Sequence, residues 1–253
     1  MKKFALISRK KANLKLQILR MKNLVYLLLT VTLFSCGNIS PKGDIEAKDV
    51  ELAEFSKLDA KGKFRLFYVE SPHNFVAVET TPNLFNNLEI GVENKILTIK
   101  EKRPTEKAGF YNLTIYGKHP FDDVKLADSV ELNISSQMKV NDFKLTLKDQ
   151  SKFIGGVIST KTWLNMTQKS RANLLGKTDQ AYVKISDTAS IISPYWFINS
   201  LELDSKNGNY TEVNVDEEIK GTITNTGKLV YYGNPSKKIK VEEKATMQQK
   251  NLN

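Results

Sequence analysis

A repeat of about 20 residues constrains the fold of this chain more than any other feature of its sequence. Two mostly apolar residues that flank one central residue recur, and the starts of successive pairs lie 21, 19, 19, 18 and 20 residues apart. The pairs are Val124 and Leu126, Leu145 and Leu147, Leu164 and Met166, Val183 and Ile185, Leu201 and Leu203, and Gly221 and Ile223. Turn-forming residues and a further apolar run follow each pair, so each unit is predicted to hold a strand, a polar corner and a second strand.

A unit of this length cannot bury both sides of its strands by itself. Stacking successive units would pair each strand with its copy about 4.8 Å away and would align the inward side chains in ladders. The repeat therefore favours an all-β fold, a parallel β-solenoid with coils of about 20 residues. The alternative is an antiparallel sandwich with two evenly spaced strands in each period. In the solenoid, one inward ladder is predicted to contain Leu147, Met166, Ile185, Leu203 and Ile223.

The segment before the repeat is predicted to be a region of strands and hairpins. Short alternating apolar runs occupy residues 64–69, 75–79, 88–92, 96–100 and 113–116. Turn-forming residues separate these runs, and residues 81–86 have the pattern of a single helical turn. This region would precede the first regular coil.

The first 35 residues have the layout of a secretory signal. They carry eight basic residues and no acidic residue, and the apolar run at 23–34 is too short to span a bilayer comfortably. The residues from Leu33 to Cys36 resemble the bacterial lipobox, in which the cysteine thiol takes a diacylglycerol and the new N-terminus is then acylated, often with palmitate. We therefore expect lipid on Cys36 to attach the mature chain to a membrane. A plain secretory signal or an uncleaved anchor is the alternative, and either Met1 or Met21 is the true start.

The composition excludes several classes of function. The formal net charge is +10, but the eight basic residues before Cys36 account for most of it, which leaves 30 basic against 28 acidic residues. A body so close to neutral argues against nucleic-acid binding. Cys36 is the only cysteine, so a thiol that carries lipid leaves none for a disulfide, a metal site or thiol catalysis.

The polar segments at the two ends suggest four parts. Residues 1–35 are the lipoprotein signal segment, and residues 36–50 are expected to be a tether that contains Pro41 and Gly43. Residues 51–236 form the solenoid domain, and residues 237–253 are expected to be a polar C-terminal tail. Within that tail, Ile239 and Val241 would complete a last strand, and the remainder would be frayed.

Three stretches of sequence resemble a known family, the head GIN domain family named for a "putative auto-transporter adhesin". They are FSKLDAKG at 55–62, LTIYGKHPFDDV at 113–124 and GKLVYYGNP at 227–235, and the last is the most specific. The resemblance covers roughly residues 50–235, although the Ser-Gly-Ser-Gly corners common in the family are missing here. It implies a β-solenoid in a secreted protein or lipoprotein of a Bacteroidetes-type bacterium, and it supplies no catalytic residues.

The residues that usually perform catalysis are scarce. The two histidines, His73 and His119, fall in predicted loops, and no nucleophile, dinucleotide or P-loop motif is present. Asp128, Asp149 and Asp187 occupy related positions in three coils, where they would cap turns or, as the alternative, form an exposed ladder that binds calcium. We predict turn capping, no metal and no cofactor. A carbohydrate-active solenoid enzyme, a lyase or a glycosidase, remains the alternative and would need a carboxylate cluster in a cleft.

Aromatic residues are the better candidates for ligand recognition. A strand exposes alternate residues, so one or two of the three consecutive aromatic residues at 195–197 must face outward. Exposed rings are typical of sugar and protein contacts, whereas packing inside the core is the alternative. The candidates are Trp163, Tyr195, Trp196, Tyr231 and Tyr232. The sequence thus predicts a lipid-anchored, non-enzymatic binding protein of the cell envelope, at the outer membrane, that presents a glycan or protein ligand site.

Overall fold

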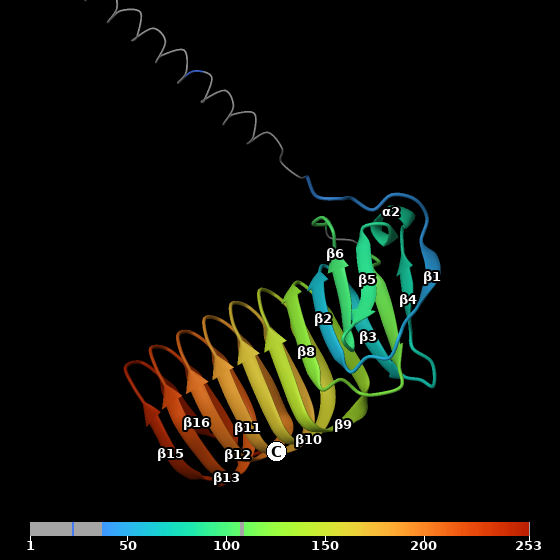
Figure 1. Ribbon diagram of the computed structural model, residues 1–253. Helices are drawn as coiled ribbons and strands as arrows, with labels where there is room; N and C mark the ends of the chain where they lie inside the picture. Colours follow the sequence, from blue (N-terminus) through green and yellow to red (C-terminus); the bar gives the residue numbers. More distant parts are fainter. Residues whose placement is uncertain (1–21, 23–36, 107–108, 253) are drawn as a thin grey trace, which may run out of the picture. The chain divides into compact units, whose positions relative to one another are not determined.

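The computed structural model describes Lys22, residues 37–106 and residues 109–252 (Figure 1). The chain divides into two units, Met1–Asn38 and Ile39–Asn253, and the fold described here is that of the second. The expected signal segment and Cys36 lie outside the described residues, so lipid attachment remains a prediction. None of the helices in the described ranges is long and apolar enough to cross a membrane.

The second unit is built almost entirely of strands. The strands are β1 (Glu46–Glu51), β2 (Lys57–Gly62), β3 (Arg65–Glu70), β4 (Phe75–Thr80), β5 (Leu88–Glu93), β6 (Ile96–Glu101), β7 (Asn112–Gly117), β8 (Asp123–Asp128), β9 (Glu131–Leu147), β10 (Lys152–Met166), β11 (Arg171–Ile185), β12 (Ser190–Ser205), β13 (Tyr210–Ile223), β14 (Lys228–Tyr232), β15 (Ser236–Val241) and β16 (Thr246–Gln249). A one-turn helix, α2 (Pro82–Phe85), follows β4 within the segment predicted to hold it.

The long strands β9 to β13 stack in parallel, and each supplies most of one coil (Figure 1). Each strand bends between its two ends, so the coils have two broad faces, which we call face A and face C, and a short bend at residues such as 156–159 joins them. Face A contains the first residues of each strand, such as 131–134 and 171–174, and continues through β3 on one side and β14 on the other. Face C contains the last residues, such as 142–147 and 180–185, and continues through β8 and β15. The bend between the faces coincides with the register shifts of these strands.

The parallel solenoid predicted from the repeat is confirmed. Leu145 pairs with Leu164, and Leu164 pairs with Val183, in the expected order. The predicted inward ladder is correct for Leu147, Met166, Ile185 and Ile223, which are buried at one register position. It is wrong by two residues in the fifth coil, where Ser205 pairs with Ile185 and Leu203 pairs with Val183. Strand alternation repeats every two residues, so a shift of two residues keeps Leu201 and Leu203 on the inner side and escapes detection from the pattern alone.

From β8 onward, one residue at each corner between face C and the next face A has a left-handed backbone. The seven residues have φ between 59° and 66°, and they are Asp128, Asp149, Gln168, Asp187, Asn207, Asn225 and Glu243. Their side chains link successive corners: an Asp149 carboxylate oxygen accepts from the Asp128 backbone N–H at 3.0 Å, and Gln168 Oε1 accepts from the Asp149 N–H at 2.7 Å. All three aspartates thus occupy corners, where short polar side chains tolerate this backbone region. The Asp149 and Asp187 side chains cap the backbone N–H of the preceding corner.

Antiparallel strands close the N-terminal end of the solenoid. The β5–β6 hairpin turns at Asn94 and Lys95, both with positive φ, and β4 and β1 add antiparallel strands to the edge of face A. The first coil in sequence, β2 and β3, lies between β6 and β8 on face C and between β7 and β9 on face A. The chain therefore builds its end cap from β4 to β7 before it resumes stacking at β8. Such a cap covers an edge that would otherwise pair with another chain.

The two polar end segments are more ordered than the sequence suggested. The expected tether is held against the end cap from Ile39 onward, because Ile39 bridges Thr105 and β1 pairs with β4. In the expected tail, 246–249 form β16 beside β14, so this part is not frayed. Lys237 takes the inward register position above Ile219, and its Nζ donates to the Tyr231 hydroxyl at 3.4 Å. A cation in an inward position of the last half-coil opposes the addition of further strands.

Replacing Ile185 with alanine should lower the free energy of unfolding by about 2–5 kcal/mol, because a large buried side chain is lost between two coils. Ile185 is buried between Met166 and Ser205. The adjacent Lys184 points outward, so Lys184→Ala should change the free energy by no more than about 0.5 kcal/mol. Urea unfolding followed by circular dichroism measures both. Similar losses for the two variants would contradict the inward register.

Candidate functional site

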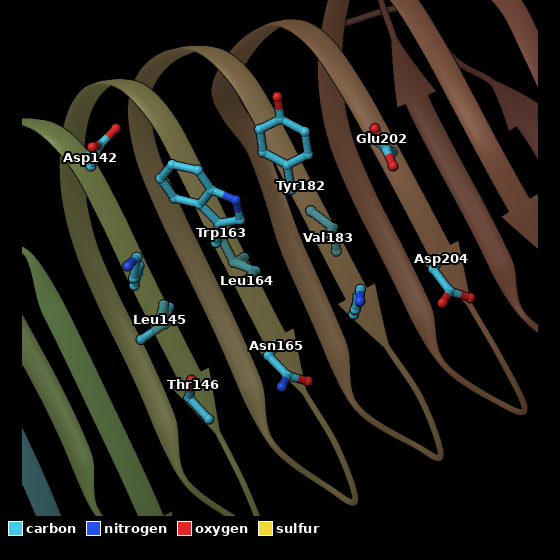
Figure 2. Close-up of a pocket in the computed structure, with 12 residues that line it drawn as sticks. Asp142, Leu145, Thr146, Trp163, Leu164, Asn165, Tyr182, Val183, Glu202 and Asp204 are labelled. Carbon is cyan, nitrogen blue, oxygen red and sulfur yellow. The ribbon is translucent and has the colours of Figure 1, made fainter.

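An open groove lies on the outer side of face C, across β9 to β12 (Figure 2). Its volume is about 760 Å³. The outward side chains that line it are Asp142, Lys144, Thr146, Trp163, Asn165, Tyr182, Lys184, Glu202 and Asp204. They belong to neighbouring coils because residues at one register position repeat along the solenoid axis: Lys144 pairs with Trp163, Trp163 with Tyr182, and Tyr182 with Glu202. The groove is thus a direct product of the parallel register.

Two aromatic rings form the centre of the groove. The Trp163 and Tyr182 ring centroids are 5.5 Å apart and the ring planes differ by 11°. Lys144 Nζ lies 5.8 Å from the Trp163 ring, within range of a cation–π contact. The Tyr182 hydroxyl donates to Gln180 Oε1 at 3.0 Å, which fixes the orientation of that ring. Figure 2 shows the two rings next to one another on β10 and β11.

Charged and amide groups surround the rings. Glu202 forms an ion pair with Lys220 at 3.1 Å, and Asp204 forms one with Lys206 at 3.6 Å. The hydrogen bond and charge of Glu202 raise the pKa of Lys220. The groove therefore combines flat apolar area with carboxylate, amide and ammonium groups within two rows of side chains. This combination matches a sugar ring, which presents C–H bonds on its faces and hydroxyl groups at its edge.

The five predicted aromatic candidates differ in how far their side chains are exposed. Trp163 is partly exposed in the groove, and Tyr195 is 54% exposed at the bend of β12. Trp196 and Tyr231 were wrong choices, because both side chains are buried, Trp196 completely. Tyr232 is partly buried, and its hydroxyl donates to Glu212. Trp163 and the more distant Tyr195 therefore do not share a site.

A bulge explains the inward orientation of Trp196. Ser193 and Phe197 of β12 pair with Val213 and Asn214, which are consecutive in β13. Three residues of β12 thus have no counterpart in β13, and the strand directs Tyr195 and Phe197 outward and Trp196 into the core. The indole occupies interior volume beside this irregularity.

Tyr182 is the groove residue that sequence reasoning missed. It stands 19 residues after Trp163, which is one coil length. The signal for the pair is that two aromatic residues occupy the same outward position in successive coils.

The described residues show no arrangement typical of acid–base catalysis. His73 and His119 are exposed in loops, and His119 Nε2 lies 3.5 Å from Glu54. Over the described ranges, Glu101 is the only carboxylate with a raised pKa; burial is the main cause, and Glu101 does not line the groove. In the same residues, no group of three or more His, Cys, Asp or Glu side chains is placed to hold a metal ion.

Comparison with known proteins agrees with this architecture. A family model described as "Putative auto-transporter adhesin, head GIN domain" matches residues 54–235. The chain belongs to this family. The resemblance carried by residues 55–62, 113–124 and 227–235 is therefore confirmed. No curated protein matches the chain.

Solved structures of similar fold share little sequence with this head GIN protein. A "putative adhesin" from Bacteroides fragilis has 15% identity and a TM-score of 0.72, over 85% of this chain and 100% of the other. A "putative lipid binding protein" from Parabacteroides distasonis has 15% identity and a TM-score of 0.66, over 84% and 99%. A "putative adhesin" from Parabacteroides merdae has 14% identity and a TM-score of 0.62, over 84% and 98%. At these identities the likeness establishes the fold alone.

Trp196→Ala should lower the free energy of unfolding by about 3–5 kcal/mol, because it removes the largest fully buried side chain. Tyr195→Ala, one position away, should change it by no more than about 0.5 kcal/mol, because that ring is exposed. Chemical denaturation with tryptophan-independent detection by circular dichroism measures both. A Trp196 variant as stable as the parent would show that the indole does not pack in the core.

Proposed function

We propose that this head GIN protein is a lipid-anchored, non-enzymatic binding protein of the cell envelope, and that its groove on face C binds glycans. The description of its family as adhesins supports a binding role at the cell surface. The single observation that carries the glycan assignment is the aromatic pair of Trp163 and Tyr182, flanked by polar side chains on neighbouring coils.

The rigidity of the solenoid supports this role. Backbone hydrogen bonds on both sides hold β10 and β11 in place, so the two rings lose little conformational freedom when a ligand binds. A repetitive surface with a spacing of about 4.8 Å also suits an extended polymer that spans several coils. The mechanism is recognition by a preformed surface, without a chemical step.

Substitution of either aromatic residue of the groove should specifically weaken glycan binding. Trp163→Ala and Tyr182→Ala in the soluble fragment 37–253 should each weaken binding to an envelope polysaccharide at least ten-fold, equal to about 1.4 kcal/mol. The control is Tyr195→Ala, an exposed aromatic residue that does not line the groove. A polysaccharide array followed by calorimetry on the positive glycans measures the affinities.

Three outcomes would count against the glycan assignment. If all three variants bind the glycan as tightly as the parent, the site lies elsewhere. Capture of an envelope protein in place of a glycan, with the same dependence on Trp163, would make the groove a protein site. Release of shortened sugar chains by the parent protein would make it a carbohydrate-active enzyme, which the arrangement of its carboxylates does not favour.

The lipid anchor is tested at Cys36. Cys36→Ser should abolish incorporation of labelled palmitate and should remove the protein from the membrane fraction, because the thiol is the proposed acceptor of the diacylglycerol. The parent protein expressed at the same level is the control. If the variant still carries labelled lipid and remains in the membrane fraction, the lipoprotein assignment is wrong.

A further inference from the structure

The exposed apolar residues of the regular coils gather on one side of the solenoid. Five of the large exposed apolar side chains lie on β10 to β12, on face A or at the bend that follows it, and form what we call the apolar ridge: Ile154, Leu175, Ile192, Tyr195 and Phe197. Face C of the same three strands has no exposed large apolar side chain, since Trp163 and Tyr182 are partly buried. Such one-sided exposure is typical of an interaction surface.

The ridge projects because the strands bend there. Tyr195 sits on the β12 bulge, among residues without a counterpart in β13. On β11, Gly176 has φ of 101°, and a Cβ atom there would lie 2.4 Å from the Val157 carbonyl oxygen, so only glycine allows the close turn. Leu175 and Tyr195 thus lie on the outside of a tight bend. A projecting apolar surface fits a deformable partner better than it fits a small ligand, which needs a concave site.

Cations border the ridge on both sides. Lys177 pairs in register with Phe197 and with Ile158, and Ile158 pairs with Lys139. On face A, Lys152, Arg171 and Lys228 occupy one outward row. Glu131 pairs with Lys152 at 3.3 Å, but over the described ranges no ion pair involves Arg171, Lys177 or Lys228. Unpaired cations beside exposed apolar side chains complement a surface that is negatively charged at its polar layer and apolar below it.

We propose that the apolar ridge and its bordering cations form a membrane-contact surface that lies on an anionic lipid leaflet. The side chains of Leu175, Tyr195 and Phe197 would enter the boundary between headgroups and acyl chains, and Lys139, Lys177 and Arg171 would contact the phosphates. A second copy of the chain is a poorer occupant, since a symmetric contact would bring the same cations together.

The covalent structure favours a nearby membrane. Only Gly37 and Asn38 separate Cys36 from Ile39, where the compact unit begins. Three residues reach roughly 10 Å, so lipid on Cys36 would keep the end cap close to the leaflet. This step rests on the proposed lipid anchor, whereas the composition of the ridge does not.

Vesicle binding by the soluble fragment 37–253, which lacks Cys36 but contains the whole compact unit, tests the ridge alone. The fragment should co-sediment with vesicles of equal parts phosphatidylglycerol and phosphatidylcholine, and added salt should weaken binding. The triple variant L175S/Y195S/F197S should bind at least ten-fold more weakly. Lys177→Glu should weaken binding roughly five-fold or more on these vesicles. The matched control, Lys125→Glu, changes an exposed residue of β8 on face C that does not line the groove, and it should bind like the parent.

The outcomes separate this proposal from the others. Failure of the parent fragment to bind anionic vesicles, or equal binding by the triple variant and the parent, would overturn it. A dimer of the parent that the triple variant dissociates, seen by light scattering without vesicle binding, would make the ridge a contact between copies and would also overturn it. Thermal unfolding of each variant, compared with that of the parent, checks that the fold is kept. Because Cys36 is absent from the fragment, a failure here leaves the Cys36→Ser result unaffected, and the reverse also holds.

Discussion

Backbone hydrogen bonding between successive coils is the interaction on which the rest of this structure depends. A strand such as β11 pairs along most of its length with β10 on one side and β12 on the other, so neighbouring coils satisfy its backbone groups. Parallel pairing aligns side chains of equal position into rows. Buried rows such as Leu145, Leu164 and Val183 supply the core, and outward rows place Lys144, Trp163 and Tyr182 beside one another.

The coils differ in length, and irregular positions absorb the difference. The left-handed corners keep a similar φ throughout. The side chains of Asp149, Gln168 and Asp187 accept hydrogen bonds from the backbone of the preceding corner, and those of Asn207 and Asn225 donate to the side chain of the preceding corner. The bend between the faces is less regular: β9 has two more residues there than β10, and β12 has two more than β13. The extra residues leave the core alignment intact because they are confined to the bend. The same confinement pushes Tyr195 outward and produces the apolar ridge.

The sequence predicted the parts of the fold that repeat and failed where the repeat is interrupted. Asp149 and Asp187 were assigned to corners because turn chemistry recurs with each coil, and Ile185 was assigned to the core because its alternation recurs. The predicted register of Leu203 is wrong, because a two-residue shift keeps every side chain on its own face of the strand and so leaves the pattern unchanged. The prediction that Trp196 is exposed is wrong because a bulge reverses the alternation of inward and outward residues locally, and a bulge leaves no periodic signal in the sequence. The position of β2 and β3 between later strands could not be predicted either, because the local sequence pattern of a strand does not show which distant strands pair with it.

The outward positions explain how one scaffold can carry two unlike surfaces. Inward residues of a coil pack against the coils above and below, so a change of size at Met166 or Ile185 is felt by their neighbours in the row. Outward residues meet only solvent and their row neighbours, and the fold requires little of them. Face C of β10 and β11 carries Trp163 and Tyr182 among polar groups, whereas the bend of the same strands carries Leu175 beside Lys177. Exposing Leu175, Tyr195 and Phe197 to water gains nothing for stability, since polar residues would serve equally well at these positions. Their clustering on one side is therefore better explained by contact with a partner than by folding.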